Sequence, residues 1–180
     1  DDHKDKIMTQ SNINHTTNFY KFPKTPHLKG SSTVDDDEVL PLSSILDSFT
    51  VLESSSSDQD LLTLLIQEKI DGTNVSVHFE HDWLPICQKR SGIIQKQNEK
   101  QQYNVFRSWV DENLEVLWNT LKTEFVLFGE FLWTQHSISY NALPDYFICF
   151  DIFDKTTGKW LSSIEIDQLL ADISIPLVPN

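Results

Sequence analysis

The sequence of 180 residues has few sulfur-containing residues and no long apolar run. Its two cysteines, Cys87 and Cys149, make neither a disulfide framework nor metal-ligand spacing, and their apolar surroundings predict buried free thiols in a reducing compartment. Runs such as "LLTLLI" and "FVLFGEFLW" are too short to cross a bilayer. The first residues, "DDHKDKIMTQSNINHTTN", lack the apolar core of a secretory signal. We therefore expect an intracellular protein, cytoplasmic or nuclear, that does not engage membranes.

Basic residues are also scarce. Lys and Arg number 14 against 27 Asp and Glu, which gives a net charge of -13. Non-specific nucleic-acid affinity comes from cations that neutralise phosphates, so this balance argues against a broad electrostatic grip, although not against a local basic path. The acidic excess is concentrated in "VDDDEVL" (34–40). The hydrophobic content of 39% and the length predict one globular domain with a real core.

The domain organisation follows from changes in composition. Residues 1–18 are polar and aperiodic and predict a disordered tail, and the first residue is Asp, which suggests a processed or incomplete product. The stretch "FYKFPKTPHLKGSS" (19–32) contains prolines and a glycine and predicts an ordered, extended segment. A serine run within residues 47–62 predicts a surface loop. The folded domain is expected over residues 19–180.

Hydrophobic patterning predicts an α+β fold with a mostly antiparallel sheet. "LLTLLIQEKI" (61–70) is interpreted as a buried strand, and "NVSVHFEH" (74–81) as a half-buried strand because apolar and polar residues alternate. "DWLPICQKR" (82–90), "EFVLFGEFLW" (124–133) and "DYFICFDIFD" (145–154) predict further strands. Apolar residues at helical spacing predict one amphipathic helix between 98 and 121. Ser162 and Glu165 predict a capping box that opens a helix extending to about Leu170.

The segment "QEKIDGTNVSVHF" (67–79) places Lys69 between two carboxylates at an Asp-Gly turn, and such a turn needs no lysine. A lysine nucleophile must be deprotonated part of the time and must lie on a rigid element beside its electrophile. Asp71 could hold a hydrated cation, and Glu68 could accept a hydrogen bond from a ligand. Gly72 permits close approach of the backbone to a phosphate or ribose, and Asn74 has a donor and an acceptor. The alternative is a surface hairpin turn with ordinary charges.

Four segments resemble, in order and spacing, motifs I, Ia, III and IIIa of the ATP-dependent RNA ligases: "KIDGTN" (69–74), "QKRSG" (88–92), "LFGEFLW" (127–133) and "YFICFDIFD" (146–154). These ligases belong to the covalent nucleotidyltransferase superfamily, which also contains DNA ligases and mRNA capping enzymes. The similarity runs from about Tyr20 to the last residue and includes "YKFPKTPHLKGS" and "HSISYNALPDYF". It implies the adenylyltransferase fold of ligases and capping enzymes.

The resemblance assigns roles to individual residues. It implies that Lys69 attacks the α-phosphate of ATP and carries AMP, and that Glu68 contacts adenine. Arg90 is implied to lie near the ribose or the phosphates, with a surface cation at a strand end as the alternative. Glu130 is implied to bind the ribose or the catalytic metal, and an inward carboxylate in an apolar strand needs such a partner. Phe150 is implied to stack on adenine, although its alternation with neighbouring isoleucines also fits plain core.

The implied cofactors are ATP and Mg²⁺ or Mn²⁺, with the metal held through waters by Asp71 and Glu130. The implied partners are RNA ends, joined through a 5′-phosphate and a 3′-hydroxyl as in RNA repair, and no obligate protein partner is evident. Asn74 favours an RNA ligase over a DNA ligase or capping-type enzyme. His27 and His136 have no ligand spacing, and a lone histidine is more often structural.

The pattern departs from the family after "PLVPN" (176–180), because motifs IV and V are not among these residues. The resemblance therefore predicts the N-terminal part of an adenylyltransferase domain, without one metal-binding carboxylate and without the lysines that neutralise the triphosphate. We expect this stretch alone to seal no RNA. The net charge and the missing motifs keep a non-catalytic nucleotide-binding fragment open as an alternative.

Overall fold

The computed structural model describes residues 17–30, 38–44, 65–95, 97 and 99–179. The predictions for the polar tail over residues 1–16, for most of the acidic run and for the serine loop lie outside these residues. None of the described helices is long and apolar enough to cross a membrane.

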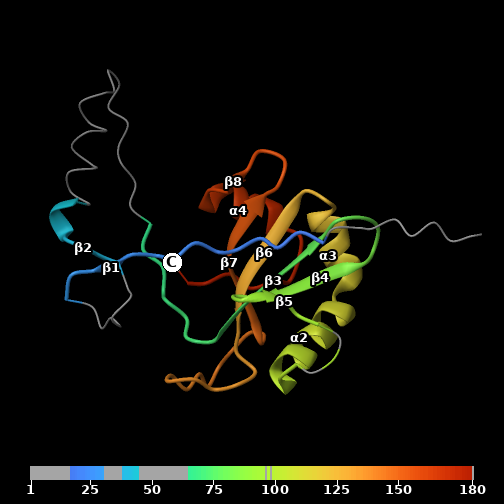
Figure 1. Cartoon of the computed structure of the whole chain (residues 1–180), viewed down its shortest axis with the longest axis horizontal. Coiled ribbons are helices and arrows are strands. Elements are labelled where there is room, and N and C mark those ends of the chain that lie inside the picture. Colours follow the sequence, from blue (N-terminus) through green and yellow to red (C-terminus); the bar gives the residue numbers. More distant parts are fainter. Residues whose placement is uncertain (1–16, 31–37, 45–64, 96, 98, 180) are drawn as a thin grey trace, which may run out of the picture.

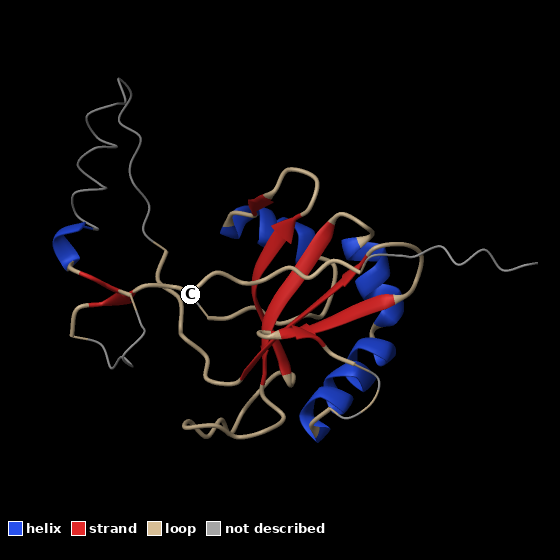
Figure 2. Cartoon of the chain, viewed as in Figure 1, coloured by secondary structure: helices blue, strands red, loops and turns tan. Residues whose placement is uncertain are grey.

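An antiparallel sheet forms the centre of the described chain (red arrows in Figure 2). It has six strands in the order β5-β4-β3-β6-β7-β8. A short parallel pair, β1 and β2, lies apart from it. The prediction of an α+β fold with a mostly antiparallel sheet is therefore confirmed. The strands are β1 (His27–Leu28), β2 (Val39–Leu40), β3 (Thr73–Phe79), β4 (Pro85–Lys89), β5 (Gly92–Ile93), β6 (Phe125–Phe131), β7 (Phe147–Asp154) and β8 (Lys159–Trp160).

Two helices, α2 (Gln101–Glu112) and α3 (Leu114–Leu121), cover one face of the sheet, called the helix face below (Figure 1). The prediction of a single helix here is wrong, because the helix breaks at Asn113. Asn113 leaves helical geometry, with φ -102° and ψ 14°, and the carbonyl of Trp109 accepts both its N–H at 3.1 Å and its side-chain amide at 2.8 Å. Phe106, Val110 and Leu117 are fully buried against the sheet. The predicted apolar stripe is thus present on two helices.

The opposite face of the sheet is crossed by residues 20–28, called the N-terminal strap (blue in Figure 1). Its main chain at Tyr20 forms two hydrogen bonds with the Gln88 side chain, one accepted by Oε1 at 2.9 Å and one donated by Nε2 at 3.0 Å. The Gln88 Nε2 group also donates to Ser76 Oγ at 2.7 Å. This face is called the strap face below.

The expectation that β3 is half-buried is wrong. Ser76 and His78 alternate with the apolar residues as the pattern requires, yet they are 3% and 0% exposed. The period of two correctly places them on the second face, but that face is covered by the strap instead of by water. Alternation reports which residues share a face, and it cannot report what covers that face.

The prediction of a buried strand over residues 61–70 is also wrong where the structure describes it. Residues 65–69 are exposed and extended, without strand pairing, and only Ile70 is buried. The Glu68 N–H donates to the carbonyl of Pro179 at 3.1 Å, so this segment lies beside the end of the described chain. A short apolar run does not by itself identify a strand.

The last predicted helix is confirmed as α4 (Ser163–Leu170), and its capping box is present. The Ser162 N–H donates to Glu165 Oε2 at 2.7 Å, while Ser162 Oγ accepts from the Glu165 N–H at 3.4 Å. The predicted strands over residues 82–90, 124–133 and 145–154 are present as β4, β6 and β7. Cys87 and Cys149 are buried free thiols, as predicted.

Candidate active site

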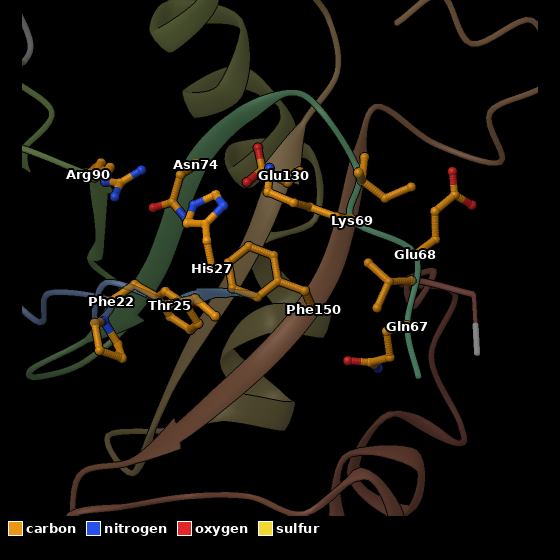
Figure 3. A pocket seen from close by; sticks show the side chains of 13 residues that line it. Phe22, Thr25, His27, Gln67, Glu68, Lys69, Asn74, Arg90, Glu130 and Phe150 are labelled. Atoms are coloured by element: carbon orange, nitrogen blue, oxygen red, sulfur yellow. The ribbon is translucent and has the colours of Figure 1, made fainter. Parts of the chain in front are cut away.

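A cavity of about 400 Å³ opens on the strap face, where segments distant in sequence meet (Figure 3). This volume is within the usual range for sites that bind small molecules. Six of the predicted site residues line it: Glu68, Lys69, Asn74, Arg90, Glu130 and Phe150. The other lining residues are Phe22, Pro23, Thr25, His27, Gln67, Ile70 and Val178.

Lys69 and Glu68 reach the cavity from the extended segment before β3, and both are exposed. The buried side chain of Ile70 packs with Leu132, Ile148 and Val178 and thereby anchors the segment next to Lys69. The Lys69 amine is therefore accessible to a ligand while its backbone is attached to a packed cluster.

Glu130 and Asn74 are paired across β6 and β3, so their side chains lie on the same face. Burial raises the pKa of Glu130 to about 7, and the charge of Asp71 adds to the rise, while the positive charges of Lys69 and Arg90 oppose it. The buried Glu130 Oε2 has no hydrogen-bond partner within the described chain. A buried carboxylate oxygen without a partner is costly, so this atom is suited to accept a hydrogen bond or bind a cation.

Phe150 is directed into the cavity by a β-bulge. The register between β6 and β7 shifts between Phe128 and Gly129, where Phe128 pairs with Asp151 and Gly129 with Cys149, which leaves Phe150 without an opposite residue. Ile152 packs in the helix-face core, whereas Ile148 and Phe150 belong to the cluster at the cavity. The alternation that favoured plain core is therefore broken, and bulges commonly redirect side chains at functional sites.

Gly129 permits this arrangement. A Cβ atom at this position would overlap the Phe147 ring and would lie 2.6 Å from the carbonyl oxygen of Ile148. The glycine beside Glu130 is thus required by the close approach of β7.

Asp71 does not line the cavity. It borders a separate hollow of about 120 Å³ formed by the loop over residues 132–143. Its Oδ2 accepts from the Ser137 N–H at 2.8 Å, which lowers the pKa of Asp71, and its own N–H donates to Tyr140 Oη at 2.9 Å. The pairing of Asp71 with Glu130 on one metal stays a prediction. Among the described residues no group of three or more His, Cys, Asp or Glu side chains could hold a metal ion.

The sequence family described as RNA ligase matches residues 62–180, which is more than half of the chain. The chain belongs to the RNA ligase family. The comparison with curated proteins found no match to this chain.

Solved structures of RNA ligases are similar to the chain over part of its length. A Naegleria gruberi RNA ligase with PPi is 24% identical with a TM-score of 0.45, and the similarity covers 63% of this chain and 34% of that one. A mutant of the Naegleria gruberi RNA ligase with ATP and Mn gives the same four values. An archaeal ATP-dependent RNA ligase is 18% identical with a TM-score of 0.44, covering 63% and 29%. The chain therefore spans about a third of the length of these ligases.

Gly72 of this RNA ligase family member has a packing requirement of its own. A Cβ atom here would lie 2.7 Å from Leu132 Cδ2 and 3.0 Å from the carbonyl oxygen of Phe131. The backbone at Gly72 thus lies close to the end of β6 and to the residue that follows it. Contact of Gly72 with a ligand stays a prediction.

Sequence reasoning missed the contribution of the N-terminal strap to the cavity of this RNA ligase family member. Phe22, Thr25 and His27 all line it. The only signal was the aromatic and proline-rich stretch itself, which predicted an ordered segment but not its position. His136 lies elsewhere, with its Nε2 at 3.1 Å from Thr73 Oγ1, so the structural interpretation suits it.

Proposed function

We propose that this chain provides the nucleotide-binding part, with the nucleophilic lysine, of an ATP-dependent RNA ligase. The observation that carries the proposal is the convergence of Lys69, Arg90, Glu130 and Phe150 on one cavity. An amine, a guanidinium, a buried carboxylate and an aromatic ring match the phosphate, sugar and base of a nucleotide. Membership of the RNA ligase family supports the same assignment.

In the proposed first step the deprotonated Lys69 Nζ attacks the α-phosphorus of ATP. A P–N bond forms, the bond from the α-phosphorus to the bridging oxygen breaks, and pyrophosphate leaves with the electron pair. AMP is then transferred to the 5′-phosphate of an RNA, and a 3′-hydroxyl displaces AMP to join the strands. Covalent catalysis of this kind divides one difficult step into easier ones.

The residues around Lys69 have separate proposed roles. The Arg90 guanidinium would neutralise phosphate charge. Asn74 and Glu68 offer hydrogen-bonding groups to the sugar and the base, and Phe150 offers a ring face to adenine. The unpartnered Glu130 Oε2 fits one ligand position of a hard cation such as Mg²⁺ or Mn²⁺, which prefers oxygen ligands. When bound, the cation would offset phosphate charge.

The direct test uses radiolabelled ATP and detects AMP bound covalently to a protein that also contains motifs IV and V, because this stretch alone is expected to adenylylate itself poorly or not at all. Lys69→Ala should lose the adduct completely, and Lys69→Arg should be equally inactive because a guanidinium stays protonated. Lys159→Ala is the matched control, since Lys159 is exposed on β8 and does not line the cavity. An AMP adduct on the folded Lys69→Ala protein would contradict the assignment.

Because this stretch alone is expected to seal no RNA, a panel of substrates assayed on a protein that also contains motifs IV and V tests which polymer is joined. The proposal expects ATP to be preferred over GTP and 5′-phosphorylated RNA to be preferred over DNA. Preference for GTP would indicate capping-type chemistry, and preference for nicked DNA would indicate a DNA ligase. Nucleotide binding without any adduct would indicate a non-catalytic nucleotide-binding protein.

A further inference from the structure

The N-terminal strap forms one side of the cavity, and its anchor lies outside the cavity. The two Tyr20 hydrogen bonds to the fully buried Gln88 hold the start of the strap on β4. At its other end the His27 N–H donates to the carbonyl of Glu38 at 2.7 Å within the β1–β2 pair. The strap is therefore held at Tyr20, before the residues that line the cavity, and at His27, which is itself one of them.

Phe22 makes aromatic contacts between the strap and the sheet. Its ring centroid lies 4.9 Å from that of Phe150 with an interplanar angle of 80°, an edge-to-face arrangement. It also contacts Trp160 at 5.0 Å and Phe128 at 5.5 Å. These contacts fix the Phe22 ring, and through it they restrict the plane in which the Phe150 ring can lie.

His27 approaches the cavity from the later part of the strap. Its imidazole points into the cavity toward the part lined by Asn74 and Glu130 (Figure 3). An imidazole can donate a hydrogen bond from a ring N–H in either tautomer. The cavity carries two carboxylates, Glu68 and Glu130, so an additional donor there favours an anionic ligand.

We propose that the N-terminal strap is a wall of the nucleotide site, in which Phe22 positions the Phe150 ring for stacking on the base and His27 donates to the sugar–phosphate part of the ligand. The proposal rests on the proposed function, because it assumes that the cavity holds a nucleotide. Phe22 acts through Phe150 and is a positioning residue, whereas His27 touches the ligand. A strap that serves only to cover the sheet would leave ligand selectivity unchanged when these side chains are altered.

The test compares dissociation constants of three ligands, adenosine, ATP and inorganic tripolyphosphate, measured by calorimetry in the same magnesium buffer. Phe22→Ala should weaken the binding of adenosine and ATP by about 2- to 12-fold, the range for loss of an aromatic pair, and should leave the binding of tripolyphosphate unchanged. His27→Ala should weaken the binding of ATP and tripolyphosphate by about 10-fold, as expected for loss of a hydrogen bond to a charged group. The binding of adenosine should be unchanged. Phe22→Tyr keeps the ring and should restore wild-type values.

Matched controls share the residue type but not the position. Phe19→Ala removes an exposed phenylalanine just before the strap, and His81→Ala removes an exposed histidine between β3 and β4. Neither residue lines the cavity, so both variants should bind all three ligands as the wild type does. Thermal unfolding of each variant shows whether the comparison is made on folded protein.

A double-mutant cycle separates positioning from general packing. If Phe22 acts through Phe150, Phe22→Ala should add no further loss of adenosine affinity in a Phe150→Ala background. Additive losses would overturn the positioning role even in folded proteins. Unchanged affinities in both single variants, with a wild type that binds ATP, would overturn the inference alone. A wild type that binds neither ATP nor adenosine would overturn the proposed function as well.

Discussion

The two faces of the sheet are both buried, but they differ in chemistry. The helix face presents Val75, Val77 and Leu127 to α2 and α3, and these side chains are 0% exposed. On the strap face Ser76 and Gln88, at 3% and 0% exposed, take the equivalent positions. A helix can cover an apolar face without further requirements, whereas a polar face must find hydrogen-bond partners.

The strap supplies part of that pairing. Gln88 is fully engaged by Tyr20 and Ser76. Burial, together with the charge of Lys155, lowers the pKa of His78 to about 3, so its imidazole is neutral and can donate to Glu80 Oε1 at 3.1 Å. Within the described chain the buried atoms Glu130 Oε2 and His78 Nδ1 lack a hydrogen-bond partner. The faces therefore differ in that the strap face keeps buried polar atoms without partners, and the proposed function assigns one of them, Glu130 Oε2, to a ligand or cation.

The largest loss in the free energy of unfolding is expected for a substitution on the helix face. Phe106 is 0% exposed and its ring contacts those of Trp109, Phe131 and Phe147. Phe106→Ala should reduce the free energy of unfolding by about 3 to 5 kcal/mol, measured by urea denaturation, because it leaves a cavity in the core.

The control for Phe106→Ala is Ile164→Ala, since Ile164 is 67% exposed on α4. This variant should change the free energy of unfolding by no more than about 0.5 kcal/mol. ATP affinity of the Phe106→Ala protein, measured where it is still folded, should remain that of the wild type. A specific loss of ATP binding would show that the helix face also shapes the site.

The second-largest effect on the free energy of unfolding is expected at Glu130 on the strap face. Its pKa is about 7 in the folded protein against 4.5 ordinarily, so between these values the folded state binds more protons than the unfolded state. Stability should therefore fall as pH rises through this window. Glu130→Gln removes the titration, and at pH 8 without metal or nucleotide it should raise the free energy of unfolding by about 3 kcal/mol at most. By pH 4 the difference from wild type should vanish.

Asp151 provides the matched comparison for Glu130. Burial raises the pKa of this carboxyl only to about 6, and it accepts the Ile152 N–H at 2.9 Å. The stability difference between Asp151→Asn and the wild type should develop at lower pH than that for Glu130→Gln. A Glu130→Gln effect independent of pH would mean that the buried carboxylate is not the cause.

Sequence patterns predicted the helix face more completely than the strap face. Alternation assigned Val75, Val77 and Phe79 to a core, because an apolar face needs only an apolar cover. The cover of the strap face comes from a segment without periodicity, so Phe22 and His27 were missed in the cavity. The bulge at Phe150 also breaks the strict period of two, and its mark in the sequence is Gly129, an isolated glycine in the facing strand. Motif spacing nevertheless predicted six residues that the fold brings to one cavity.

Release of the strap should have an intermediate effect. Gln88→Ala removes three hydrogen bonds and leaves the Tyr20 main chain and Ser76 without their partner, at a cost of about 1 to 3 kcal/mol. Amide hydrogen exchange of residues 20–28 should accelerate, while exchange in α2 should change only with global stability. Gln168→Ala, at an exposed position on α4, is the control. Unchanged protection of the strap would show that its aromatic contacts suffice.

The smallest effect is expected for the charged pair at the edge of the helix face. Lys89 Nζ donates to Glu99 Oε1 at 2.8 Å and Oε2 at 2.6 Å, and it lies over the Tyr103 ring at 5.0 Å. The side chains of Lys89 and Glu99 are 24% and 9% exposed, so water and salt screen the pair only in part. Lys89→Met should reduce the free energy of unfolding by only about 0.5 to 1 kcal/mol.

Salt and pH sharpen this last prediction. The hydrogen bond from Lys89 lowers the pKa of Glu99, so the pair stabilises the fold above the ordinary pKa of 4.5 and loses that contribution as pH falls through the lowered value. The difference between Lys89→Met and wild type should therefore shrink in 1 M salt and at acid pH, in urea denaturation at each condition. A loss as large as that of Gln88→Ala and insensitive to salt would mean that polar pairing supports the helix face as well, and the contrast between the two faces would fail.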